Sequence, residues 1–114
     1  MELAQLPKHH AVLIVHPERH EAKEKLWAEL SSLSPVHRIF DQTVLDIDTA
    51  RAIISWANTP YNDEKIAMVS FATATIPAQN AMLKIVEEPN IRVRFIFVTS
   101  NKVNLLETFL SRTH

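Results

Sequence analysis

Glycine is absent from this 114-residue chain, and its absence limits function before any motif is considered. Glycine is the usual residue where the backbone takes a positive φ or approaches a phosphate closely. A glycine-cradled nucleotide loop is therefore excluded. Cysteine is absent as well, which rules out a disulfide framework and any thiolate metal site. The default expectation from this composition is an intracellular, cytoplasmic protein.

An excess of one charge and long apolar runs are also missing. The net charge is −1, so the chain has no overall basic footprint for nucleic acid, and any DNA contact is expected to be weak or indirect. No apolar run approaches the roughly 20 residues that cross a bilayer, and the opening "MELAQLPKHH" lacks the features of a signal peptide. We expect a soluble protein with no membrane contact.

The residues that are present indicate one globular α/β domain over residues 1–114. Short β-rich apolar runs alternate with segments of helical periodicity. The runs are 11–15, 36–40, 66–71 and 93–98, and a last helix is predicted over 104–112. The order βαβαβαβα predicts a three-layer fold, in which helices flank a parallel sheet of about four strands.

Three apolar stripes define the helices between these runs. They consist of Ala22, Leu26, Leu30 and Leu33, then Ala50, Ile53, Ile54 and Ala57, then Ala78, Ala81, Met82, Ile85 and Val86. Asp46 and Asp48 are candidate N-caps of the second helix. Pro77 suits the first turn of the third helix, and Pro89 ends that segment.

Candidate catalytic and metal-binding residues are weak. Glu87 and Glu88 end the third helix, but adjacent helical positions point about 100° apart, so they do not converge as an acid and a base. His16 and His20 are four residues apart, yet Pro17 and the end of a strand separate them from a shared helical face. No serine lies in a glycine-flanked elbow. We therefore predict no metal, no cofactor and no catalytic residue in the chain itself.

The segment "IPAQNAMLKIVEEP" (76–89) resembles the "AQNALLKTLEEP" stretch of bacterial clamp-loader subunits, the delta-prime and tau/gamma chains of DNA polymerase III, which are AAA+ proteins. The likeness continues in register through "RFIFVTSNKVNLLETFLSR" (94–112), which is similar to the family's sensor 1 strand and the helix ending in Ser-Arg-Cys. The upstream strand, loop and helix over 9–30 also align. The resemblance thus spans nearly the whole chain.

This chain departs from the family at both ATP motifs. The Walker A position reads "HPERHEAK" (16–23), with His16 in place of the first glycine, Glu21 at the sixth position and Lys23 one place late. The Walker B position reads "VSFATA" (69–74) and has no carboxylate for magnesium or water. ATP hydrolysis is therefore not expected.

The resemblance also implies the sheet order. The family's order 5-1-4-3-2 would leave this chain with 1-4-3-2, without the fifth strand, the helical lid or the collar domain. The 11–15 strand then becomes an apolar edge, and such an edge favours pairing with another chain. A clamp-loader subunit or a second copy of this protein is the partner we expect.

The function implied by the resemblance is that of a non-hydrolysing, delta-prime-like subunit or domain of the clamp loader in DNA replication. Arg112, preceded by Ser111, matches the arginine that reaches a neighbouring subunit's ATP, and Thr99 matches sensor 1. The alternative is a degenerate AAA+ core that serves as an interaction or self-associating module outside the clamp loader. A small ATPase or metal enzyme is disfavoured by the lost motifs.

Overall fold

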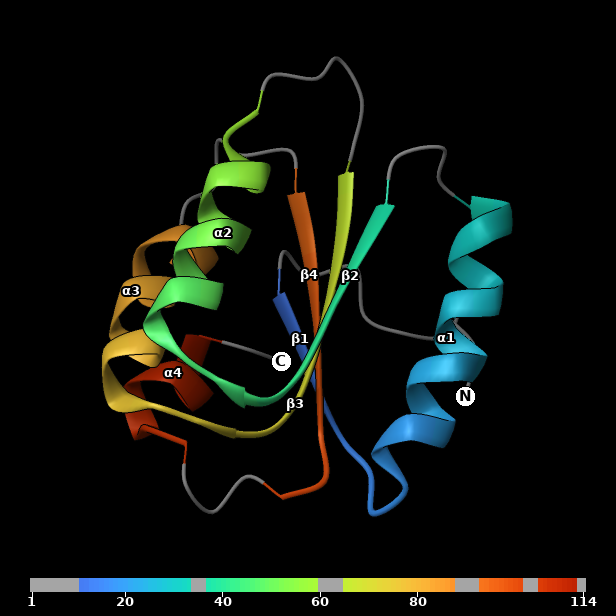
Figure 1. Ribbon diagram of the computed structural model, residues 1–114, viewed down its shortest axis with the longest axis horizontal. Coiled ribbons are helices and arrows are strands. Elements are labelled where there is room, and N and C mark those ends of the chain that lie inside the picture. Colours follow the sequence, from blue (N-terminus) through green and yellow to red (C-terminus); the bar gives the residue numbers. More distant parts are fainter. Residues whose placement is uncertain (1–10, 34–36, 60–64, 88–92, 102–104, 113–114) are drawn as a thin grey trace.

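The computed structural model describes residues 11–33, 37–59, 65–87, 93–101 and 105–112, without the side chains of 30–33, 37 and 111–112. Within these ranges strands and helices alternate along the chain (Figure 1). Their bounds are β1 Ala11–Val15, α1 Arg19–Leu33, β2 His37–Leu45, α2 Ile47–Ala57, β3 Lys65–Ala74, α3 Ile76–Glu87, β4 Val93–Thr99 and α4 Glu107–Arg112.

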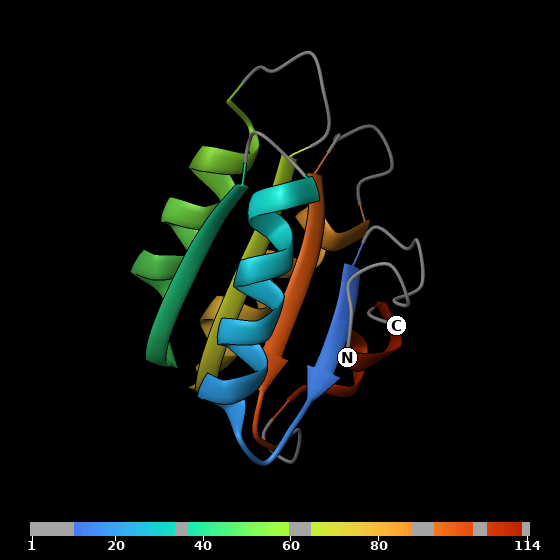
Figure 2. The same cartoon turned by 90° about the vertical axis from the view of Figure 1, so that its right-hand side faces the viewer.

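The strands form one sheet in the order β1-β4-β3-β2, and every neighbouring pair is parallel. In the middle of the sheet, Ser70 of β3 is paired with Asp41 of β2 on one side and with Val98 of β4 on the other. The strands β1 and β2 form the two edges (Figure 2). The predicted α/β class and the predicted order 1-4-3-2 are both confirmed.

One face of the sheet is covered by α1 (Figure 1). Leu26 of this helix is buried against apolar side chains from β1, β3 and β4, with Ala22 packed beside it; those side chains are Val12, Ile14, Ile66, Met68, Ile96 and Val98. The other two members of the predicted stripe, Leu30 and Leu33, have side chains outside the described part of the chain. We call this surface of the sheet the α1 face.

The opposite surface, covered by α2, α3 and α4, carries the larger part of the core (Figure 1). Phe71, Phe95 and Phe97 point from the strands into it, and Phe109 joins them from α4. Phe97 and Phe109 meet edge to face, with ring centroids 5.1 Å apart, an arrangement that aromatic pairs favour. We call this surface the α2–α4 face.

Strands β2 and β3 are longer than the apolar runs 36–40 and 66–71 predict. They end at Leu45 and Ala74, which pair with each other. The prediction ended the first of them at the polar letters "DQT", because it relied on apolar runs alone. An edge strand needs backbone pairing on one side only and tolerates exposed polar side chains. This correction places Asp41 inside the sheet.

The start of α2 follows one of the two predicted caps. The Asp46 carboxylate accepts a hydrogen bond from the Thr49 N–H at 2.8 Å, and its backbone is extended, as at an N-cap. That hydrogen bond lowers the pKa of Asp46 below its ordinary value. Asp48 lies inside the first turn, where a carboxylate favours the helix dipole without capping it.

The start of α3 is capped by Thr75, whose hydroxyl accepts a hydrogen bond from the Ala78 N–H at 3.2 Å. Pro77 lies in the first turn, as predicted. In the last helix, Glu107 is the first residue, so α4 is shorter than the predicted range 104–112; residue 104 itself lies outside the described ranges.

Candidate functional site

The loop from β1 into α1 begins the segment that aligns with Walker A. Only three residues separate the strand from the helix, and none has a backbone N–H left for a phosphate. The His16 N–H donates to the Thr99 carbonyl at 2.9 Å, and the Glu18 N–H donates to Nδ1 of His16, also at 2.9 Å. Pro17 has no N–H. A phosphate cradle needs several free amides, and these three loop residues leave none.

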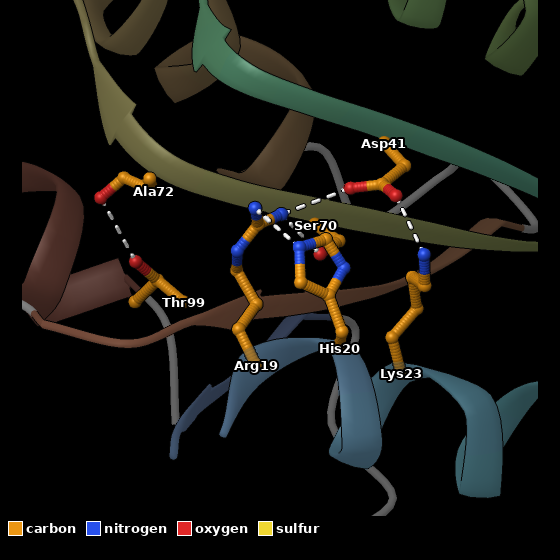
Figure 3. Close-up of polar contacts among 7 residues, drawn as sticks. All are labelled: Arg19, His20, Lys23, Asp41, Ser70, Ala72 and Thr99. Carbon is orange, nitrogen blue, oxygen red and sulfur yellow. Dashed lines mark hydrogen bonds and ion pairs between the residues drawn. The ribbon is translucent and has the colours of Figure 1, made fainter. Parts of the chain in front are cut away.

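Side chains from α1 and the sheet form a polar cluster beside this loop (Figure 3). Arg19 Nη1 donates to Asp41 Oδ1 and to Ser70 Oγ, both at 2.9 Å. Lys23 Nζ donates to Asp41 Oδ2 at 2.6 Å. Arg19 Nη2 lies 3.2 Å from Nε2 of His20, and since a guanidinium has only donors, the ring nitrogen is the acceptor.

Asp41 therefore engages both cations of the cluster, one with each carboxylate oxygen. The side chains of Arg19, Lys23 and Asp41 are 10%, 18% and 30% exposed, so solvent screens these pairs only in part. Partial burial raises the pKa of Asp41, but the hydrogen bonds and charges of Lys23 and then of Arg19 outweigh it, and the pKa falls below 3.8. The cluster links α1 to β2 and β3 in the ionised state.

The carboxyl end of β3 aligns with Walker B, and its two key positions point to opposite faces of the sheet. Ser70 is buried toward α1, where its hydroxyl accepts the Arg19 hydrogen bond. Phe71 is buried in the core of the α2–α4 face. Neither position carries a carboxylate, and one of them is a packing residue.

Thr99, the sensor 1 match, is fully buried at the end of β4. Its hydroxyl lies within hydrogen-bonding distance of the carbonyls of Ala72, at 3.4 Å (Figure 3), and Asn101, at 3.3 Å. Its own carbonyl accepts the His16 N–H. Thr99 thus connects the carboxyl ends of β1, β3 and β4 through polar contacts within the chain.

Glu21 lies on α1 beside a small hollow of about 40 Å³, lined by His16, Glu21, Ala22, Lys25 and Leu26. Its carboxylate pairs with Lys25 one turn further along, at 3.3 Å. Ligand pockets usually have volumes of about 300–1,000 Å³, so this hollow is too small for a nucleotide. The carboxylate would also repel a phosphate.

Gln79 in the first turn of α3 is a buried polar residue with contacts in two directions. Its side-chain amide donates to the Ala74 carbonyl at 3.1 Å and accepts a hydrogen bond from the Leu106 N–H at 2.6 Å. Leu106 directly precedes α4, and its carbonyl accepts the first hydrogen bond of that helix, from Leu110. Gln79 therefore links the end of β3 to the start of α4.

The remaining predicted residues lie at or beside the carboxyl ends of α3 and α4. Arg112 is the last residue of α4, and its side chain and that of Ser111 lie outside the described part of the structure. Glu87 ends α3 and is exposed, whereas Glu88 falls outside the described ranges.

The described residues contain neither a metal-binding cluster nor a helix that could span a membrane. No three histidines, cysteines or carboxylates gather in a way that could hold a metal ion. No helix there is long and apolar enough to span a membrane.

Three polar residues of the site were not predicted from the sequence: Arg19, Asp41 and Gln79. Arg19 and Asp41 were visible as opposite charges in "HPER" and "IFDQ", but their pairing depends on the register of β2 against β3. Gln79 was visible as a polar residue on an otherwise apolar helix stripe, and such a residue is often buried with hydrogen-bond partners.

Comparison with known proteins places the chain in a family. No curated protein matches the sequence. Among solved structures, a DNA polymerase III gamma subunit-related protein from Thermotoga maritima is similar, with a TM-score of 0.69 and 24% sequence identity. The match covers 94% of this chain but 40% of that one, so the chain spans less than half of that neighbour, and the likeness concerns the fold.

The family comparison covers more of the chain. The family model described as "DNA polymerase III, delta subunit" matches residues 6–114, nearly the whole sequence. The resemblance to clamp-loader subunits drawn from "IPAQNAMLKIVEEP" is thereby confirmed. This chain belongs to the DNA polymerase III delta subunit family.

Proposed function

We propose that the chain acts as a non-hydrolysing, delta-prime-like subunit or domain of the DNA polymerase III clamp loader. Family membership supports the link to the clamp loader. The site at the carboxyl edge of the sheet supports the non-hydrolysing part. In this proposal the chain contributes structure and contacts to an ATPase ring, and its neighbours supply the nucleotide chemistry.

One observation carries the proposal: the loop amides between β1 and α1 and the basic side chains beside them are bonded within the chain. The His16 N–H donates to the Thr99 carbonyl, and the Glu18 N–H donates to Nδ1 of the His16 ring. Both basic side chains of the cluster are paired with Asp41. Phosphoryl transfer depends on amides, a cation and a magnesium-binding carboxylate acting together. Here the loop amides and both cations are engaged within the chain, and the carboxylate of the cluster, Asp41, is paired with those cations.

Calorimetric titration of the 114-residue chain with ATP and magnesium tests this part of the proposal. We expect no binding heat and no shift in melting temperature. A ligand that bound the folded state alone would raise its stability and therefore its melting temperature. A clamp-loader subunit with intact Walker motifs, titrated under the same conditions, is the positive control. A one-to-one isotherm with a micromolar Kd would contradict the proposal.

Arg112, with Ser111 before it, is the residue that we propose acts on a neighbouring subunit's ATP. A planar guanidinium suits the charge that develops on transferred phosphate oxygens. Phe109, three residues before Arg112, anchors the helix that carries it. The Phe109 ring is buried and packs on Phe97. In a reconstituted loader, Arg112→Ala should abolish stimulated ATPase activity while this chain keeps its melting temperature. An unaltered rate would remove this role.

The alternative function is a self-associating or interaction module outside the clamp loader. The observation that favours it is the edge strand β1, which within the described residues pairs with β4 on one side and leaves Val15 46% exposed. Mass by light scattering and amide exchange over 11–15 test it: a dimer with slow exchange in this strand supports self-association. A monomer with fast exchange, together with co-purification of clamp-loader subunits, supports the first function.

A further inference from the structure

Gln79 stands out because its buried amide does not serve the helix that contains it. The start of α3 is already capped by Thr75, which accepts from the Ala78 N–H and, through its carbonyl, from the Gln79 N–H. The Gln79 side chain, 1% exposed, is free of that task. It bonds instead to the end of β3 and to the N–H of Leu106 at the start of α4.

The helix α4 needs such a contact because it is short. It spans six residues, and isolated helices of this length are not stable in water. Its apolar contacts come from Phe109, which packs on Phe97, and from Leu105 and Leu106, which pack against the same core. Apolar packing is not directional. The hydrogen bond from the Leu106 N–H to Gln79 is directional and fixes where the helix begins.

We infer that Gln79 is a positioning residue for Arg112: by holding the first residue before α4, it sets the direction in which the helix carries Arg112. This inference rests on the proposed role of Arg112. At about 1.5 Å per residue, Arg112 lies about 9 Å beyond Leu106 along the axis. A tilt of about 10° at the start would therefore move the end of the helix by about 1.5 Å. A displacement of that size is sufficient to lower the rate of a positioned reaction by about 100-fold.

The test uses the full chain in a reconstituted clamp loader and compares Gln79→Leu, Arg112→Ala and the double variant. Gln79→Leu keeps the side-chain size but removes both hydrogen bonds. We expect a loss in kcat of about ten-fold or more, with the KM for ATP unchanged. In the Arg112→Ala background, Gln79→Leu should cause no further loss, because the two residues act through one contact.

Two variants of glutamine serve as references. Gln42→Leu makes the same chemical change on exposed β2 and should keep the wild-type rate. Gln79→Asn keeps a neutral amide but shortens the side chain by one methylene, so its hydrogen bonds should weaken and its kcat should lie between wild type and Gln79→Leu. A positioning role predicts this graded rescue, whereas a residue that only fills space does not.

The outcomes separate the inference from the proposed function. If Arg112→Ala keeps the wild-type rate, the arginine role fails and the inference fails with it. If Arg112→Ala loses activity while Gln79→Leu does not, or if the two losses add, only the inference is overturned. If Gln79→Leu does not fold, Leu106→Pro removes the same donor N–H at the residue before the helix, outside the helix interior where proline removes an intrahelical hydrogen bond. It should reproduce the loss in kcat, and a wild-type rate in that variant overturns the inference.

Discussion

The two faces of the sheet are held by different forces. On the α1 face a small apolar cluster lies next to the ionic group of Arg19, Lys23 and Asp41. On the α2–α4 face a larger apolar core with five phenylalanines fixes three helices. Adjacent residues of one strand, Ser70 and Phe71, belong one to each face, since strand side chains alternate.

This difference determines where the segment that aligns with Walker B could accept a carboxylate. On the α1 face it carries Ser70, a polar residue whose hydroxyl lies next to the Arg19 guanidinium. On the α2–α4 face it carries Phe71, which is buried in the core. A carboxylate is therefore expected to be tolerated less well at Phe71 than at Ser70.

The largest effect is expected from Phe71→Glu, which introduces a carboxylate into the α2–α4 face. A buried charge without a partner costs several kcal/mol, and we expect a loss of about 4 kcal/mol or more in the free energy of unfolding. That is a large part of the roughly 5–15 kcal/mol by which an ordinary domain is stable. Phe71→Leu, which stays apolar, should cost about 1 kcal/mol. Urea unfolding followed by tryptophan fluorescence measures both, and equal stabilities would contradict this view of the face.

A smaller loss is expected from Asp41→Ala on the α1 face. It leaves Arg19 and Lys23 half-buried without an anion, and we expect a cost of about 2 kcal/mol, below the value for fully buried pairs. Since salt screens charges, the difference from wild type should shrink in 1 M NaCl. Asp48→Ala is the matched control, because its pair with Arg51 is exposed, and it should change stability by less than about 0.5 kcal/mol. A salt-independent loss at Asp41 would indicate packing in place of charge.

These two faces also differ in how far the sequence predicts them. The helix over Ile76–Glu87 and the parallel order of strands follow from periodicity and from the resemblance of "IPAQNAMLKIVEEP", because apolar patterns record which side of an element is buried. The extension of β2 to Leu45 does not follow, because the polar letters of an exposed edge strand resemble those of a loop.

The polar contacts could not be predicted, because they depend on register. Asp41 reaches Arg19 only when β2 pairs with β3 so that Asp41 lies beside Ser70, and one residue of slip would turn it to the other face. Gln79 likewise meets Leu106 across 27 positions of sequence. The sequence shows that the segments aligned with the Walker motifs lack glycines and a Walker B carboxylate, but the contacts of the residues found there required coordinates.

Ser70→Asp should change the free energy of unfolding less than Phe71→Glu or Asp41→Ala does. It adds a carboxylate where Arg19 Nη1 already lies 2.9 Å from the serine oxygen. The new charge gains that guanidinium but is repelled by Asp41, and we expect a net change of about 1 kcal/mol or less. In the Ser70→Asp, Asp41→Asn double variant this repulsion is removed, and stability should rise relative to Ser70→Asp. A loss as large as that of Phe71→Glu would show that the α1 face is as intolerant of charge as the other.

The smallest expected effect is the loss of stability at low pH that comes from Asp41 on the α1 face. The pKa of Asp41 lies below 3.8 in the folded chain, because Lys23 and Arg19 outweigh the effect of burial, and it returns to about 3.8 on unfolding. The folded state therefore binds fewer protons, so the contribution of Asp41 is fully present above pH 3.8 and is lost as the pH falls through the folded pKa.

Comparison with Asp41→Asn isolates the contribution of Asp41 to the pH dependence of stability. The other acid-sensitive group, Asp46, has a pKa lowered by its hydrogen bond from Thr49, and its contribution is common to both proteins. Urea unfolding of both proteins between pH 7 and pH 3 measures it. Wild type should be the more stable at neutral pH, and the difference should narrow only below about pH 4. A difference that narrows nearer neutrality would mean that a group other than Asp41 holds α1 to the sheet, and the ionic account of this face would have to be given up.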